Sequence, residues 1–456
     1  MSTPPDTVAT ALRDDAVAIW TAGVRAVDSA ALVRQAVERR GDQLVIAGES
    51  IPLGDVDRIV VLGGGKAGAG MAAGLEAALG ADLVTSRVQG WLNVPADCVR
   101  PLAAIHLHAG RPAGLNEPTA EGVAGSEQIL SLAAGMGPRD LAIVLLSGGG
   151  SALLPAPAPG ITLSEKQLVT RLLMHRGATI EELNGVRSAL SRIKAGGLLR
   201  AMPAGRCFTL IISDVIGDPL DVIASAPTVP ISADRPLAVE ILRRFVRRDE
   251  VPDSVWTVLK HHHPAAVTTI PVRNVVIGNN RTALDAAAET AQSLGYAIAA
   301  VETDQRGIAR EVGVALAKRL LEFRGQPCES RGWCLLSGGE PTVQLVPTDQ
   351  PQKGGRNQEL ALAALDRLWS EPLAGLALLS GGTDGEDGPT DAAGAVFDAE
   401  LRHRAETLGL HPAPFLAINN AYPFWQQTGG LLLTGATHTN VMDVRVGLMA
   451  KKPCTK

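Results

Sequence analysis

The stretch IVVLGGGKAGAG at residues 59–70 decides the fold expected for this chain. Its first four residues are apolar and mostly β-branched, a pattern typical of a buried strand in a parallel sheet. The glycines that follow allow a tight turn, and residues 71–79 are predicted to form a helix. Backbone N–H groups in such a turn can bind an anion together with the positive end of the helix. Lys66 adds a cation to this turn, so we expect phosphate or carboxylate chemistry here.

The glycine turn matches two nucleotide-binding motifs only in part. The glycines at 63, 65 and 68 satisfy the G-x-G-x-x-G dinucleotide fingerprint, which also requires an acid at the end of the next strand. We expect that strand at about residues 83–88, where Asp82 precedes it and no acid follows, so the nicotinamide interpretation is weakened. Ala67 follows the lysine where a P-loop has Ser or Thr. A glycine turn with a purely structural role remains an open alternative.

Composition indicates large aliphatic cores. The 456 residues are 46% hydrophobic but only 3% aromatic, and 49 are glycine, which favours α/β layers over a β-sandwich. The formal net charge is −5, so we expect no nucleic acid partner. The five cysteines are scattered without a C-x-x-C pair, which argues against a disulfide framework or a structural zinc. No signal pattern or 18-residue apolar run is present, so we expect a cytoplasmic protein without a membrane span.

The alternation of apolar strands and helical segments predicts two α/β domains, each with a mostly parallel sheet flanked by helices. We place them at residues 1–250 and 265–456, because residues 235–260 are polar and charged and three histidines follow at 261–263. Adjacent histidines do not share one face well, so a solvated linker is favoured over a metal site. Residues 184–200 are predicted to form one helix carrying Arg187.

The segment Leu-Leu-Ser-Gly-Gly occurs three times, at residues 145–149, 335–339 and 378–382. Each copy ends a predicted buried strand, and ligands bind beyond the carboxyl ends of the strands in open parallel sheets. Three such loops are hard to explain as turns alone. The candidate binding residues at strand ends and in the glycine turn are Gly64, Gly65, Ser147, Gly148, Gly149, Gly150, Ser151, Asp214, Asn279, Glu340, Thr383 and Asp384.

Charged residues near these loops suggest how an anion would be handled. Arg356 lies in KGGRNQE, residues 353–359, where a helix N-terminus and a guanidinium can both face an anion. An exposed arginine with a structural partner is the alternative. Asp214 and Asp384 can hold Mg²⁺ through water, as phosphoryl transfer requires, although turn-forming Asp is common. His438 is the best candidate base for a hydrolase, but no nucleophile loop matches it.

Together these segments resemble the MOFRL-type (class II) glycerate kinases over essentially the whole chain. Each motif is modest, but their order in one chain is specific. The motifs are GGGKAG (63–68), LSGGGSALL (146–154), residues 183–197, SDVIGDP (213–219), GGRNQE (354–359), SGGTDG (380–385) and TGATHTNVMD (434–443).

The resemblance implies a Rossmann-like N-terminal domain, a MOFRL-type C-terminal domain and an active site in the cleft between them. It implies transfer of the γ-phosphate of ATP, with Mg²⁺, to D-glycerate, usually at the 2-hydroxyl to give 2-phosphoglycerate. Lys66 and Arg356 take the catalytic positions, and Arg187, His438 and Asn440 join the candidate binding residues. We expect only small-molecule substrates and allow for a homodimer. The family often has a His-Pro pair where this chain has Arg111-Pro112, which affects the substrate contacts of that loop.

Two other functions remain as alternatives. Members of this family have also been labelled hydroxypyruvate reductases, and a nicotinamide-dependent enzyme of that kind is the runner-up. The missing acid after the second strand argues against it. A two-domain sensor that binds a small organic acid is the non-enzymatic option. Release of ADP that depends on glycerate separates the kinase from both.

Overall fold

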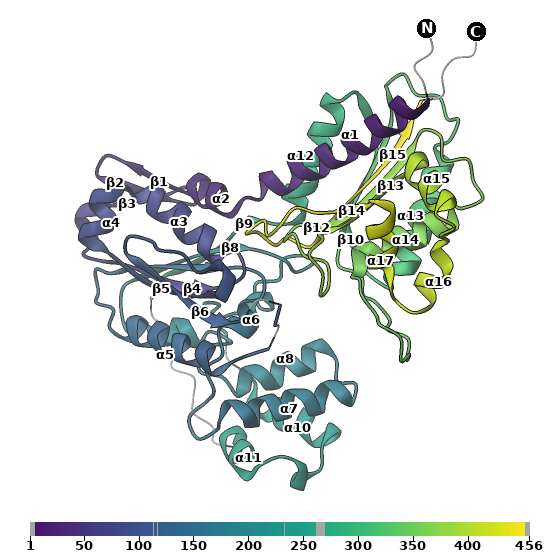
Figure 1. Cartoon of the computed structure of the whole chain (residues 1–456). Coiled ribbons are helices and arrows are strands. Elements are labelled where there is room, and N and C mark those ends of the chain that lie inside the picture. Colours follow the sequence, from purple (N-terminus) through teal and green to yellow (C-terminus); the bar gives the residue numbers. More distant parts are fainter. Residues whose placement is uncertain (1–4, 113, 116, 232, 261–269, 452–456) are drawn as a thin grey trace. The chain divides into compact units, whose positions relative to one another are not determined.

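The computed structural model describes residues 5–112, 114–115, 117–231, 233–260 and 270–451 (Figure 1). The chain folds into two compact units. We call residues 29–277 the first-sheet unit, and residues 1–28 together with 278–456 the second-sheet unit. Each is described below by itself.

The first-sheet unit contains a six-stranded sheet in the order β6-β5-β4-β7-β8-β9. The pairs β4–β5, β4–β7, β5–β6 and β7–β8 are all parallel, which confirms the α/β prediction for this half. The order is that of a doubly wound sheet, in which the chain turns in opposite directions from β4 and ligands bind at this switch point. The strands are β4 (Ile59–Gly64), β5 (Val88–Pro95), β6 (Ile105–Arg111), β7 (Leu141–Leu146), β8 (Arg206–Ile212) and β9 (Val272–Gly278).

Strands β4 and β7 lie side by side at the switch point, and every residue in both is buried. Their continuous apolar sequences suit a strand covered on both faces. Smaller elements surround the sheet. They are α2 (Ser29–Ala36), β1 (Val37–Arg40), β2 (Gln43–Ile46), β3 (Glu49–Pro52), α3 (Gly68–Leu79), α4 (Ala81–Arg87), α5 (Ala120–Ala134), α6 (Gly150–Leu153) and α9 (Gly197–Ala201).

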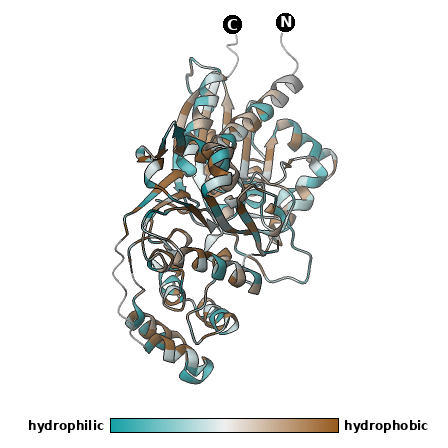
Figure 2. Ribbon diagram, turned by 90° about the vertical axis from the view of Figure 1, so that its left-hand side faces the viewer, coloured by the Kyte–Doolittle hydropathy of each residue, from teal (hydrophilic) through white to brown (hydrophobic). Residues whose placement is uncertain are grey.

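Four helices of the first-sheet unit form a separate lobe, visible at the bottom of Figure 1. They are α7 (Leu163–His175), α8 (Ile180–Ala189), α10 (Arg235–Phe245) and α11 (Asp253–Lys260). Each is amphipathic, and Figure 2 shows hydrophilic and hydrophobic residues on the same helices. The apolar faces pack into one core that includes Val169, Leu183, Leu242 and Trp256.

The lobe corrects two predictions. Residues 235–260 were expected to be a polar, charged segment at the domain boundary, but they form α10 and α11, because apolar residues at helical spacing bury one face of each helix. The single helix expected at 184–200 is instead α8 and α9, separated by a segment in which Ala195 has φ 46°. Residues 261–263, the three histidines of the expected linker, lie outside the described residues.

The second strand of the first sheet also differs from the prediction. Residues 81–87 form α4, and the strand β5 begins only at Val88 and ends at Pro95. Asp97 follows two residues beyond this end. The argument against a nicotinamide cofactor from a missing acid was therefore wrong, and the choice of cofactor rests on other evidence.

The second-sheet unit contains a mixed six-stranded sheet in the order β10-β11-β15-β12-β13-β14. Within the described strands, β10 and β11 pair in parallel, whereas the pairs β11–β15, β12–β15, β12–β13 and β13–β14 are antiparallel. The prediction of a mostly parallel sheet was wrong for this half. The strand β15 is buried at seven of its eight residues, and a continuous apolar strand fits either direction. The strands are β10 (Tyr296–Gln305), β11 (Gly332–Gly339), β12 (Leu376–Gly382), β13 (Gly394–Asp398), β14 (Leu431–Leu432) and β15 (Asp443–Ala450).

The N-terminal helix α1 (Pro5–Ala26) belongs to the second-sheet unit and contacts α12, β12 and β15. Ala16, Ile19 and Trp20 are buried, and the Trp20 indole N–H donates to the Gly381 carbonyl at 3.2 Å. The predicted domain bounds, 1–250 and 265–456, need correction, since residues 1–28 belong with the second sheet. The sequence did not indicate this, because an amphipathic helix can cover either sheet. The other helices are α12 (Asn280–Ser293), α13 (Ala309–Glu322), α14 (Arg356–Arg367), α15 (Ala399–Thr407), α16 (Pro412–Ala417) and α17 (Ala421–Thr428).

Within the described residues, no single helix combines the length and hydropathy that a membrane span needs. Two consecutive helical segments, 11–26 and 29–36, meet those criteria jointly, by length and composition alone.

Candidate active site

The glycine turn after β4 is bonded to the loop after β7. Lys66 N–H donates to the Gly148 carbonyl at 2.8 Å, and Ala67 N–H donates to Ser147 Oγ at 3.0 Å. A Cβ on Gly65, whose φ is 149°, would lie 2.1 Å from Ser147 Oγ, so only glycine allows this close approach. The backbone N–H groups from Gly65 to Gly68 all have protein acceptors. The expected anion cradle of turn N–H groups is therefore not formed by these four, and the anion-binding role of the Lys66 side chain stays a prediction.

The Lys66 side chain and the Arg111 guanidinium both approach Gly149. A Cβ on Gly149 would lie 3.4 Å from Lys66 Cγ and 3.2 Å from Arg111 Nη2. Gly149 has φ 78°, and Arg111 is 4% exposed. Arg111 thus places a permanent cation close to Lys66 at the switch point.

Ser151, at the end of the same loop, contacts two further cations. Its Oγ accepts hydrogen bonds from Lys194 Nζ at 2.7 Å and from Arg187 Nη2 at 3.0 Å. Lys194 Nζ also donates to Ser225 Oγ at 3.2 Å. The structure places Arg187, a predicted binding residue, beside the SGGGS loop, and its binding role stays a prediction. Lys194 lies in the same motif but was not among the predicted site residues.

Burial disfavours the charged forms of these cations. Burial, and after it the nearby charge of Arg187, lowers the pKa of Lys166 on α7 to about 7. Burial and the charges of Arg187 and Lys166 lower the pKa of Lys194 well below its usual value, and burial lowers the pKa of Arg187. Lys166 was missed because nothing in its local sequence separates it from a surface lysine.

We predict that Lys166 contributes increasingly to the stability of the unliganded protein as the pH rises above 7. The folded pKa of Lys166, about 7, lies below the ordinary value of 10.5, so the unfolded chain binds more protons between these values. Arg187 and Lys194 carry the same charge as Lys166, so neither of them raises the pKa of Lys166. Urea unfolding at pH 7, 8 and 9 gives the free energy of unfolding of wild type and of Lys166→Met. The difference between the two proteins should change by up to about 1.4 kcal/mol per pH unit. Parallel pH profiles would contradict the prediction.

In the second-sheet unit, candidate residues meet where β11 and β12 end and β15 begins. Asp443 at the start of β15 pairs with Gly339 and Gly382, the last residues of β11 and β12. Glu340, Thr383 and Asp384 follow directly in sequence. The structure thus brings together the second and third strand-end loops that the sequence indicated.

Arg356 is held at this edge by two carboxylates. Its Nε donates to Asp443 Oδ2 at 2.9 Å, its Nη2 to Asp443 Oδ1 at 3.0 Å and its Nη1 to Glu340 Oε1 at 2.7 Å. Burial opposes the charge, but the charge and hydrogen bonds of Asp443 outweigh it and raise the pKa of Arg356 above its ordinary range. Asp443 is fully buried and also accepts from Arg445 Nη2 at 3.2 Å. Arg356 therefore has the structural partners that the alternative interpretation required, and its catalytic role stays a prediction.

The N-terminus of α14 already faces a protein carboxylate. Asp387 accepts from Asn357 N–H at 3.0 Å and from Gln358 N–H at 2.8 Å. Burial raises the pKa of Asp387 to about 7 despite these hydrogen bonds. The expectation that this helix end faces a substrate anion is therefore wrong for these two N–H groups. Asp387 and Asp443 were not predicted, because their partners lie 29 to 87 residues away in sequence.

Other predicted residues have local roles. Thr383 Oγ1 donates to the Met442 carbonyl at 2.7 Å, and Asn440 Oδ1 accepts from Met442 N–H at 3.2 Å. Asn279 caps α12 by accepting from Thr282 N–H at 3.0 Å. His438 has φ 57°, a left-handed backbone conformation that non-glycine residues seldom adopt. These contacts explain the residues structurally and leave their predicted binding roles untested.

The two predicted metal ligands lie in different units. Asp214 follows β8 in the first-sheet unit, and Asp384 follows β12 in the second-sheet unit. Across the ranges that the structure describes, no three His, Cys, Asp or Glu side chains gather in a group fit to hold a metal. Mg²⁺ usually binds one or two carboxylates and completes its shell with water and substrate phosphates. A single aspartate at either strand end fits that requirement.

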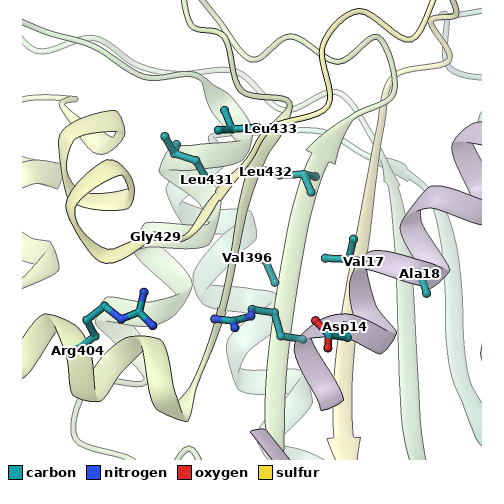
Figure 3. A pocket seen from close by; sticks show the side chains of 10 residues that line it. Asp14, Val17, Ala18, Val396, Arg404, Gly429, Leu431, Leu432 and Leu433 are labelled. Carbon is teal, nitrogen blue, oxygen red and sulfur yellow. The ribbon is translucent and has the colours of Figure 1, made fainter. Parts of the chain in front are cut away.

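A cavity of about 660 Å³ lies elsewhere in the second-sheet unit (Figure 3). Side chains of α1, β13, α15 and the segment around β14 line it, among them Asp14, Arg404 and Leu432. None of the predicted site residues belongs to its lining.

The two units and their strand-end loops define a two-domain α/β protein with cations at the switch point of a doubly wound sheet. Two family models match the chain. The "Domain of unknown function (DUF4147)" matches residues 15–260, and the "MOFRL family" matches residues 333–443.

Curated relatives cover nearly all of the chain. A glycerate kinase from Danio rerio is 38% identical over 97% of this chain and 98% of the relative. A D-glycerate 2-kinase from Thermotoga maritima is 33% identical over 88% and 93%. The crystal structure of a glycerate kinase from Thermotoga maritima superposes with a TM-score of 0.82, 30% identity, and coverage of 97% of this chain and all of that one. The chain belongs to the MOFRL-type glycerate kinase family, as the sequence motifs predicted.

Proposed function

We propose that this protein transfers the γ-phosphoryl group of ATP to the 2-hydroxyl of D-glycerate and releases 2-phosphoglycerate and ADP. The observation that carries the proposal is the near full-length similarity to a D-glycerate 2-kinase, 33% identical over 93% of that enzyme. The comparisons give no support to the nicotinamide-dependent reductase. We also propose a cytoplasmic enzyme that acts on small molecules without nucleic acid or membrane partners.

Phosphoryl transfer needs little covalent chemistry from the protein and depends on positioning and on neutralising charge. In this proposal Lys66 serves the transferring oxygens, since its N–H is bonded to Gly148 and its side chain extends beside Gly149. Arg111 holds a second positive charge near the same loop. Mg²⁺, when bound, neutralises phosphate charge, and Asp214 or Asp384 would hold it through water. That Arg356 serves the same reaction is part of the proposal.

A coupled assay of ADP release over a panel of hydroxy acids tests the function. We expect ADP release with D-glycerate and Mg²⁺, and far less with L-glycerate, lactate or hydroxypyruvate. Phosphorus NMR of the product distinguishes 2-phosphoglycerate from 3-phosphoglycerate. Oxidation of NADH by hydroxypyruvate, with no release of ADP from ATP when glycerate is added, would contradict the kinase function. Light scattering on the purified protein tests the homodimer separately.

A further inference from the structure

Two cations of the first-sheet unit contact Ser151 without a balancing acid, and a third, Lys166, lies near enough to couple to both electrostatically. Lys194 Nζ and Arg187 Nη2 lie 2.7 and 3.0 Å from Ser151 Oγ. Burial and neighbouring cations lower the pKa of Lys166 and of Lys194, and burial lowers the pKa of Arg187. In the parts of the chain that the structure describes, no carboxylate forms an ion pair with any of the three. We call Ser151, Lys166, Arg187, Lys194 and Ser225 the Ser151 cluster.

Lys166 is the member that a purely structural role does not explain. It is 6% exposed, and its Nζ has no hydrogen-bond partner among the described residues. Burying an ammonium group without a partner is costly, and nearby Arg187 and Lys194 increase that cost. Buried ammonium groups are normally paired with an acid, so the unpaired Lys166 ammonium suits a site whose anionic partner is a ligand.

The backbone around the cluster is held in unusual conformations. Ala224, Ser225 and Ala226 have φ values of 49°, 62° and 57°, and Ala195, next to Lys194, has φ 46°. Two backbone hydrogen bonds join these segments, from Ala195 N–H to the Ser225 carbonyl at 2.9 Å and from Gly196 N–H to the Ala226 carbonyl at 2.7 Å. Left-handed non-glycine residues persist where the surrounding structure enforces them, as at ligand sites.

We propose that the Ser151 cluster binds one compact oxyanion, a carboxylate or a phosphoryl group, between Lys166, Arg187 and Lys194. Guanidinium and ammonium groups together recognise such oxygens through charge-assisted hydrogen bonds. Ser151 Oγ accepts from both cations and lies 3.2 Å from Ser225 Oγ, with which it shares a hydrogen bond, so the three cations and not the hydroxyl supply the donors for the anion. If the proposed function holds, the two sources are the carboxylate of D-glycerate and a phosphoryl group of ATP.

The position of the cluster suits a substrate of the proposed reaction. Ser151 lies two residues after Gly149, which Lys66 and Arg111 approach. One end of the loop would then face the transferring group while the other binds the anchoring oxyanion. The buried setting of Lys166 and Lys194, 6% and 2% exposed, suits a compact group rather than a whole nucleotide.

The variant Lys166→Met tests the cluster, because it keeps the length of the side chain and removes the charge. Lys260→Met, on an exposed position of α11, is the matched control. Calorimetry with D-glycerate, inorganic phosphate and ATP measures binding without turnover, and steady-state kinetics gives KM and kcat for each substrate. We expect roughly a 10- to 100-fold loss of affinity for one oxyanion source, with the corresponding KM raised more than kcat is lowered. The control should behave as wild type.

Thermal unfolding separates binding from structure. Without ligand, Lys166→Met should melt no lower than wild type, because the substitution removes repulsion. Arg187→Gln, which keeps a hydrogen-bond donor for Ser151, should weaken the same ligand. A raised KM for D-glycerate assigns the carboxylate, and a raised KM for ATP assigns the phosphoryl group. Unchanged binding of all three ligands in both variants, or a lower melting temperature with unchanged KM, would overturn the site. If wild type binds oxyanions more tightly than Lys166→Met but releases no ADP, the oxyanion site is supported and the kinase function is rejected.

Discussion

Replacement of Lys66 by methionine should lower kcat by roughly 10²- to 10⁴-fold while the melting temperature stays close to that of wild type. A cation that stabilises developing charge typically contributes several kcal/mol to the transition state. The backbone N–H of Lys66 donates to the Gly148 carbonyl at 2.8 Å, and methionine at this position keeps that bond. The close approach of the turn to the end of β7 and to Ser147 depends on the glycines at 63 and 65.

The same variant distinguishes three roles. A loss of kcat and kcat/KM together indicates an interaction made in the transition state. An unchanged kcat with a raised KM for ATP would make Lys66 a ground-state contact with the nucleotide. A large drop in melting temperature would return it to a structural role. Lys260→Met serves again as the control for loss of a lysine in the same unit.

Replacement of Arg356 by lysine should lower kcat/KM by about 10²-fold and destabilise the second-sheet unit by about 1–3 kcal/mol. Lysine keeps the charge beside Asp443 but loses the planar fork. Arg356 uses that fork to donate from Nε and Nη2 to the two oxygens of Asp443, at 2.9 and 3.0 Å. Asp443 is fully buried, so lost donors leave a carboxylate that is poorly satisfied. Urea unfolding and the coupled ADP assay measure the two effects.

Arg310→Lys is the matched control for Arg356. Arg310 also binds a buried carboxylate, with its Nε 2.7 Å from Glu359 Oε1, and belongs to the same unit. We expect a similar loss of stability with activity retained. If Arg310→Lys and Arg356→Lys lose stability and activity to the same extent, Arg356 acts through folding alone. A wild-type turnover in Arg356→Lys would also reject its catalytic role.

The sequence by itself determined the central features of the first-sheet unit. The apolar run at residues 59–62 and the glycines after it are local signals, and they predicted a buried strand and a tight turn where β4 and its loop lie. The repeated Leu-Leu-Ser-Gly-Gly segments likewise end β7, β11 and β12. The order of motifs predicted the glycerate kinase family, which the comparisons confirm. The helical spacing of apolar residues within 235–260 is also a local signal, although the polar composition of this segment is equally typical of a boundary.

The tertiary structure alone decided which distant segments share a site. The antiparallel direction of β15, the attachment of α1 to the second sheet and the pairing of Arg356 with Asp443, 87 residues away, have no local signal. The same holds for the three cations of the Ser151 cluster, which come from α7, α8 and the segment before α9. Strand direction, helix docking and charge pairing depend on energies between residues far apart in the chain. A sequence pattern records which residues will be buried but not which partners they will meet.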